Sequence, residues 1–222
     1  MKRNNKGFSL VELLVSFAIL GIISVIIGII LTSGSNMFTK NKKVLSLQYK
    51  SQVTSAQLHN HLQNCNAGIA ADENSLWAAH KEDENNGEIF IFTLDDDENT
   101  IYLRTFDVAV TVDDTGASTV EVTYEGEAGP ADPVNSVTSG VIADCVAQPF
   151  CSGVESWQIE TGPAGGTYAK YATVTLNLEQ EGSSYSRKTA ESFRNRPLNV
   201  DISGISDDDK TDKVINTIFG LE

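Results

Sequence analysis

The sequence predicts an α+β protein in which one long N-terminal helix packs on an antiparallel β-sheet head. The first observation is a helical composition from residue 8 to about residue 64, apolar all round in its first half and amphipathic in its second. The second is a change near residue 88 to short segments of alternating apolar and polar residues, separated by turn residues. Because an apolar helix stripe and an apolar sheet face can cover each other, the two halves predict one packed domain.

The first half of the helix, residues 8–31, is long and apolar enough to cross a membrane. Its helical length would be about 36 Å, against a hydrocarbon core about 30 Å thick. Its only charged residue is Glu12, and the basic residues Lys2, Arg3 and Lys6 precede it. Basic residues at a membrane end favour the cytoplasm. No second apolar run of this length follows, so we expect a single-pass protein with a cytoplasmic N-terminus and an extracytoplasmic head.

The second half of the helix, residues 32–66, carries an apolar stripe that must be covered. Its small polar members are Ser51 and Thr54. The apolar members recur at helical spacing: Val44, Leu47, Leu58, Leu62 and Cys65. The residues around Gly68 then provide a stop signal.

The head is predicted from residue 67 to residue 197. A short helix is expected at residues 76–81, and a loop is expected at 126–138. Turn residues join the first strands into two hairpins. The expected strands are 88–94, 101–106, 108–112, 119–124, 154–160, 168–178 and 185–193.

The sequence also predicts a separate role for each end of the chain. Residues 1–7 are a leader that takes no part in the fold. Residues 198–222 are an acidic C-terminal extension, in which Ser206 and three aspartates form a good helix start before a short apolar face.

Composition argues against nucleic-acid binding. The chain has 222 residues and a net charge of −14, and without the leader 13 basic side chains face 30 acidic ones, a balance of −17. A phosphate backbone requires clusters of Lys and Arg. Among the three cysteines, Cys145 and Cys151 are close enough in sequence to form a candidate disulfide; three buried thiols are the other interpretation.

No motif predicts an enzyme, a cofactor or a metal. Asp95, Asp97 and Asn99 suggest a calcium loop, but the EF-hand pattern lacks its glycine and its final acid. His59 and His61 are two residues apart on a helix and so face different directions. Neither a catalytic triad nor a phosphate-binding loop is present in the sequence.

The N-terminal residues Lys6-Gly7-Phe8-Ser9-Leu10-Val11-Glu12-Leu13-Leu14 resemble the prepilin signature of type IV pilins and type II secretion pseudopilins. This resemblance implies that a membrane prepilin peptidase cleaves between Gly7 and Phe8 and N-methylates the new Phe8 amine. It also implies that the helix anchors the subunit in the membrane and later packs with other pilin subunits in a filament built on an assembly platform.

The chemistry of Glu12 supports the same interpretation. A carboxylate inside a membrane costs on the order of 3 kcal/mol and by default indicates a function. After cleavage, the Phe8 amine is a positive charge at the same depth. In a staggered helix bundle, Glu12 of one subunit can pair with the Phe8 amine of a neighbour and so set the axial register.

A weaker resemblance extends over residues 140–197, to the minor-pilin group related to the J-type pseudopilin and the W-type minor pilin. It implies a minor subunit that primes or caps a cell-surface filament. The alternative is an adhesin or competence-type pilin, whose head binds a surface or DNA.

Overall fold

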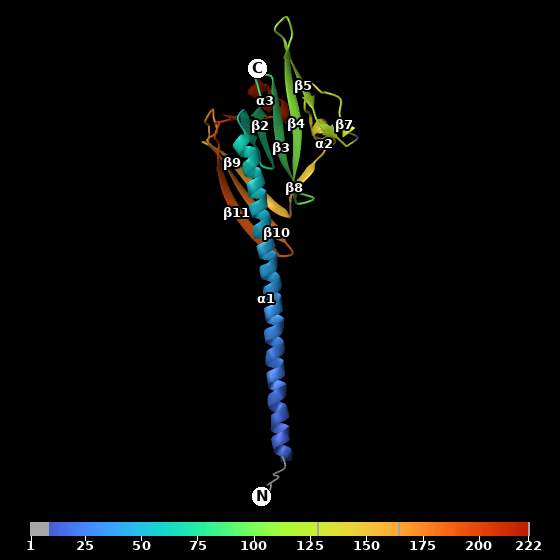
Figure 1. Ribbon diagram of the computed structural model, residues 1–222, viewed down its shortest axis with the longest axis vertical. Helices are drawn as coiled ribbons and strands as arrows, with labels where there is room; N and C mark the ends of the chain where they lie inside the picture. The colour runs from blue at the N-terminus through green and yellow to red at the C-terminus, as the bar shows by residue number, and fades with distance from the viewer. Residues whose placement is uncertain (1–8, 128, 164, 222) are drawn as a thin grey trace, which may run out of the picture. The chain divides into compact units, whose positions relative to one another are not determined.

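The computed structural model describes residues 9–127, 129–163 and 165–221 (Figure 1). Its first element is α1 (Leu10–Asn64), a helix of 55 residues, as the sequence predicts. The chain divides into two compact units, Met1–Leu45 and Ser46–Glu222. The first unit contains the N-terminal part of α1; the second contains the rest of α1 and the head.

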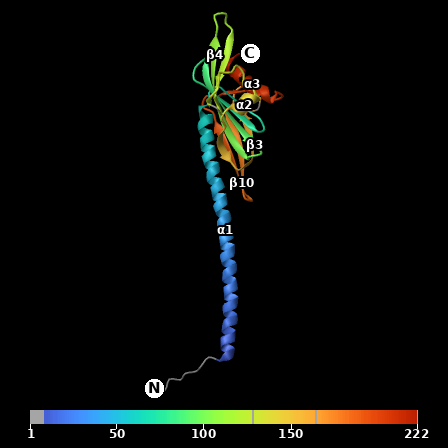
Figure 2. The ribbon, with the colours of Figure 1, turned by 90° about the vertical axis from the view of Figure 1, so that its right-hand side faces the viewer.

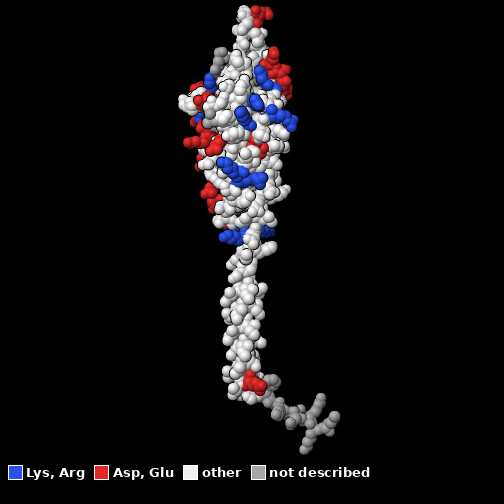
Figure 3. Space-filling view, turned by 90° about the vertical axis from the view of Figure 1, so that its left-hand side faces the viewer, with Lys and Arg blue, Asp and Glu red and all other residues white. Residues whose placement is uncertain are grey.

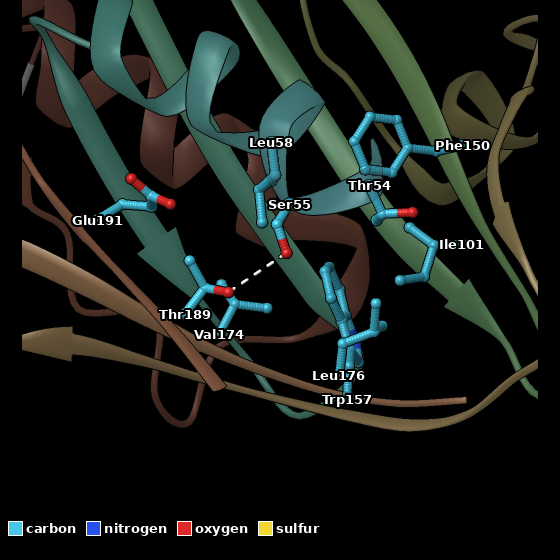
Figure 4. Close-up of a pocket in the computed structure, with 10 residues that line it drawn as sticks. All are labelled: Thr54, Ser55, Leu58, Ile101, Phe150, Trp157, Val174, Leu176, Thr189 and Glu191. Carbon is cyan, nitrogen blue, oxygen red and sulfur yellow. Dashed lines mark hydrogen bonds between the residues drawn. The ribbon is translucent and has the colours of Figure 1, made fainter. Parts of the chain in front are cut away.

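Within the second unit, α1 is held by most of the predicted stripe, whereas Val44 is only half-buried and Cys65 follows the end of the helix. Its buried side chains recur every three or four residues: Leu47, Ser51, Thr54, Leu58 and Leu62. Polar contacts add to this packing, because Lys50 Nζ donates to the backbone O and to Oγ of Ser152, both at 2.9 Å. Ser55 Oγ and Thr189 Oγ1 lie 3.3 Å apart (Figure 4).

The larger sheet has seven strands, in the order β12-β1-β2-β3-β4-β5, with β8 also paired to β4. Only the pairing of β12 with β1 is parallel among these strands. The two predicted hairpins are confirmed as β3–β4 and β4–β5, with β4 running unbroken through both. The strands are β1 (Gly68–Ala71), β2 (Ser75–Lys81), β3 (Asn86–Asp95), β4 (Thr100–Val112), β5 (Ser118–Thr123), β8 (Gln148–Ser152) and β12 (Leu198–Asn199).

The smaller sheet has three antiparallel strands in the order β11-β10-β9. They are β9 (Val154–Gly162), β10 (Tyr171–Gln180) and β11 (Ser183–Ser192), close to the predicted positions. The expected loop at 126–138 contains part of a two-stranded ladder, β6 (Glu125–Gly126) with β7 (Gly129–Pro130). The short helix α2 (Ser139–Asp144) lies between β7 and β8 in the sequence.

Two hydrophobic clusters cover the two faces of the larger sheet. The first contains the α1 stripe, Trp157 and the apolar face of β10, and Figure 4 shows part of it where α1 meets the smaller sheet. The second contains Trp77, Phe106 and the apolar side of α3 (Asp207–Phe219). Consequently α1 and α3 lie on opposite sides of the larger sheet (Figure 2).

The helix expected at residues 76–81 is wrong, because this segment is strand β2. Leu76 and Ala78 point into the first cluster, whereas Trp77 and Ala79 point into the second. A strand buried on both faces is continuously apolar, so the alternation that marks a half-exposed strand is missing.

The C-terminal segment forms the helix that the sequence predicts, and this helix packs on the head. Val214, Ile215 and Ile218 are buried in the second cluster, and Trp77 Nε1 donates to Thr211 Oγ1 at 3.0 Å. Gly220 ends the helix at φ 70°, a left-handed conformation that suits glycine. The segment therefore belongs to the core of the head.

Candidate processing and assembly segment

The segment that the sequence singles out is the start of α1. Gly7 and Phe8, the expected cleavage and methylation residues, lie outside the described residues. Ser9 directly precedes the helix, and its carbonyl accepts from the N–H of Leu13 at 3.1 Å. Its Oγ accepts from the N–H of Glu12 at 3.4 Å. Ser9 therefore caps the helix immediately after the expected cleavage point.

This capping role was missed in the sequence, although the signal was readable. Ser9-x-x-Glu12 is the Ser-x-x-Glu pattern of a capping box, which marks helix starts. Glu12 lies in the first turn of α1, where the helix dipole favours a negative charge. The pattern thus fixes the point at which the helix begins and places the carboxylate within its first turn.

Glu12 has no basic residue near it on the following helix. The next charged residue along the chain is Lys40, which is about 42 Å further along the axis. A counter-charge for this carboxylate must therefore come from the residues that precede the helix or from another molecule.

The surface of α1 around Glu12 is apolar and uncovered. From Leu10 to Leu31 the large hydrophobic side chains are 49–80% exposed, and Figure 3 shows this part of the helix as white apart from acidic atoms near its N-terminal end. By length and composition the helix can cross a membrane. An apolar surface of this extent requires lipid or other apolar helices around it.

Four hydroxyl groups in the first part of α1 are satisfied within the helix. Ser16, Ser24, Thr32 and Thr39 each donate to the carbonyl four residues earlier, at 2.8, 2.8, 2.9 and 3.0 Å. An unsatisfied polar group in hydrocarbon costs several kcal/mol, whereas a hydroxyl bonded to its own helix carries little of that penalty. These side chains are therefore compatible with a lipid environment.

The candidate disulfide between Cys145 and Cys151 is wrong for this structure, in which both thiols are free. Their separation explains this, because Cys145 belongs to the second cluster and Cys151 to the first. Burial raises the pKa of both thiols, and that of Cys65 to about 12. All three are therefore protonated at neutral pH, and a protonated thiol is a poor nucleophile and metal ligand.

Asp95, His59 and His61, which the sequence analysis considered for a metal, contact other groups of the protein. Asp95 Oδ1 accepts from the N–H groups of Asp97 and Glu98 at 3.0 and 3.1 Å, so it stabilises the β3–β4 turn. His59 Nδ1 lies 2.5 Å from Glu191 Oε2, whereas His61 contacts the ring of Phe90. Within the part of the chain that the structure describes, no group of three or more His, Cys, Asp or Glu residues could hold a metal ion.

Comparison with known proteins bears on the N-terminal segment alone. Residues 2–33 match the family model of the prokaryotic N-terminal methylation motif. The chain carries this motif, the signature of type IV pilins and pseudopilins. Neither a curated protein nor a solved structure matches the chain.

The motif and the geometry agree on what this segment can do. The motif is that of a type IV pilin-like precursor, from a structural family of proteins. It implies processing by a prepilin peptidase and assembly with other pilins. The exposed apolar helix fits the membrane anchoring of such a subunit.

Proposed function

We propose that the chain is a minor pilin or pseudopilin, a non-enzymatic subunit of a type IV pilus or a type II secretion-like filament. It is cleaved between Gly7 and Phe8, methylated at Phe8 and held in the membrane by residues 8–31. It then leaves the membrane through assembly of its N-terminal helix with other subunits and primes or caps the filament. Its head and the second half of α1 are extracytoplasmic.

The observation that carries this proposal is the uncovered apolar helix with one carboxylate in its first turn. In a membrane, the charge on Glu12 is unfavourable without a counter-ion. Cleavage before Phe8 would create an amine four residues before Glu12 in the sequence. Because Glu12 is exposed on α1, the amine of a neighbouring subunit can approach its carboxylate from the side.

The head supports a structural role in a filament. Its charge disfavours a nucleic-acid ligand, because residues 72–222 contain 29 acidic and nine basic side chains. Its two clusters are covered on both faces of the larger sheet by helices or by the smaller sheet. The uncovered apolar surface of the described chain is concentrated on the first half of α1, where assembly is proposed.

Cleavage is tested by replacing Gly7 with valine in the presence of the cognate prepilin peptidase. We expect the unmodified chain to yield a faster-migrating product and Gly7→Val to remain as the precursor. Gly21→Val is a matched control, because a Cβ at Gly21 would meet no atom within 4 Å. An unchanged ratio of precursor to product in Gly7→Val would remove the proposal.

Assembly is tested by Glu12→Gln, which keeps the side-chain shape and removes the charge. We expect the precursor to be cleaved but to be lost from sheared filaments. Glu88→Gln, on the head sheet, changes the net charge equally and should leave incorporation unaltered. Normal incorporation of Glu12→Gln would contradict the proposed pairing with an amine.

A further inference from the structure

Charge is distributed unevenly along this chain. Between Glu12 and Asp72 the sequence has no acidic residue, and its charged residues there are four lysines: Lys40, Lys42, Lys43 and Lys50. The remainder, from residue 72 onward, has a surplus of 20 acidic side chains. The lysines thus form a local positive region in a strongly acidic protein, just beyond the apolar segment.

Two of these lysines are exposed on the helix and carry the inference. Lys40 and Lys42 are exposed residues of α1, and we call them the basic collar. Lys50 has a different role, because its ammonium bonds to Ser152 of the head. Lys43 is half-buried and is not counted in the collar.

The two collar lysines lie on opposite sides of the helix. At 3.6 residues per turn, a separation of two residues corresponds to a rotation of about 200°. A protein that docks on one side of α1 would therefore meet one of them. A charged surface perpendicular to the helix axis would meet both.

The basic collar lies a short distance along the helix axis beyond the expected edge of a membrane. Lys40 lies nine residues after Leu31, or about 13 Å along the axis. The headgroup layer occupies about 5–8 Å beyond each side of the hydrocarbon core. The collar is therefore about 5–8 Å outside that layer, within the Debye length of about 8 Å at physiological salt. Met37 and Phe38 lie between Leu31 and the collar in the sequence and are 67% and 71% exposed. They offer apolar side chains to the boundary between the membrane and water.

From this arrangement we propose that the basic collar of Lys40 and Lys42 binds anionic phospholipid headgroups at the extracytoplasmic face of the membrane. This inference rests on the proposed membrane-anchored state. Residues 8–31 hold the anchor in the membrane because their apolar length fits the hydrocarbon core. The collar would in addition give the anchor a preference for anionic lipids and fix the depth of α1 in the membrane. Copies of α1 bring no acidic residue to this level, so a bundle of these helices alone would not neutralise the collar.

The test measures which lipids surround the collar. The full chain carrying Phe38→Trp is reconstituted into vesicles of phosphatidylcholine and phosphatidylglycerol, one of which carries bromine near the glycerol backbone. Quenching of the fluorescence of the introduced tryptophan then gives the relative binding constant of the anionic lipid. The buried Trp77 and Trp157 of the head give a background that the chain without the substitution records. In the sequence, the whole apolar segment separates the leader lysines from this probe.

We expect a preference for the anionic lipid on the order of fivefold per collar lysine at low salt. It should disappear at 1 M salt, where the Debye length is about 3 Å. Lys40→Gln with Lys42→Gln should bring the relative binding constant to about one. The matched control is Lys170→Gln with Lys188→Gln, two lysines of the head that lie outside the collar, and it should retain the full preference.

Three results would overturn the inference: equal binding of both lipids by the unmodified chain, an equal loss in the control, or a preference that salt does not reduce. A chain without lipid preference whose collar instead cross-links to the acidic head of a second subunit would also overturn it. Flotation with the vesicles after carbonate washing is recorded first. A chain that fails to float contradicts the proposed anchoring itself, whereas one that floats without lipid preference contradicts only the role of the collar.

Discussion

The packing of α1 on the head is tested by the same substitution at two positions of the same helix. Leu47 is 1% exposed and belongs to the first cluster, whereas Leu45 is 65% exposed. Leu47→Ala removes buried contacts, and Leu45→Ala removes exposed ones. Because both changes have the same effect on helix propensity, that contribution cancels in the comparison.

The magnitude follows from the burial of the two side chains. Replacing a buried Leu by Ala lowers the free energy of unfolding by about 2–5 kcal/mol, and we take about 3 kcal/mol for Leu47. For a domain of this size, each kcal/mol shifts the Tm by about 2–4 °C. Leu47→Ala should therefore lower the Tm by about 6–12 °C. An exposed substitution changes the stability by about 0.5 kcal/mol or less, so Leu45→Ala should shift the Tm by about 2 °C at most.

Thermal unfolding of the full chain in non-ionic detergent measures both shifts. Near-ultraviolet circular dichroism is a suitable signal, because Trp157 lies in the same cluster as Leu47. Equal shifts for the two variants, or a larger shift for Leu45→Ala, would refute the packing of the stripe on the sheets.

Three further predictions concern the head. Burial lowers the pKa of His61, so the folded state binds its proton less tightly than the unfolded state, and stability should fall as the pH drops through about 6.5. His61→Gln should weaken this fall in Tm between about pH 7 and pH 5; an identical pH profile would contradict it. The Lys210 ammonium lowers the pKa of Asp72 through a hydrogen bond. This pair therefore stabilises the fold at pH values above the unfolded pKa of Asp72, which is about 4. The stabilisation is lost as the pH falls through and below that value. Lys210→Met should cost about 0.5–1 kcal/mol at about pH 7, and less at about pH 3, in urea unfolding; a cost that does not change with pH would exclude the ionic origin. Finally, reduction should leave the Tm unchanged because Cys145 and Cys151 are free, and a lower Tm with dithiothreitol would show a disulfide.

The long helix and most hairpins could be predicted because their signals are local. The α1 stripe repeats at helical spacing from Leu47 to Leu62, and the strands of β3–β4 and β4–β5 lie on either side of polar turns. The helical pattern arises because one face of α1 is buried and the other is exposed, and the hairpins are marked by the turn residues between their strands. The apolar segment before them could be assigned from its length alone.

Other features depend on partners that are distant in sequence. Strand β2 has no alternation because both of its faces are buried, one by α1 and one by α3. The pairing of Gly68 with Leu198 in parallel register brings the C-terminal segment into the larger sheet, which no local pattern indicates. Cys145 and Cys151 are close in sequence but belong to different faces, so their spacing was misleading. Ser9, by contrast, belongs to a local capping pattern with Glu12, so its role could have been predicted from the sequence.

The most direct test of the account is the identity of the N-terminal residue in the mature protein. Mass spectrometry of the chain after co-expression with its prepilin peptidase should find a polypeptide that begins with N-methylated Phe8 and lacks Met1 to Gly7. A chain that still begins at Met1 in assembled filaments, or one that is cleaved after residue 31, would contradict the account.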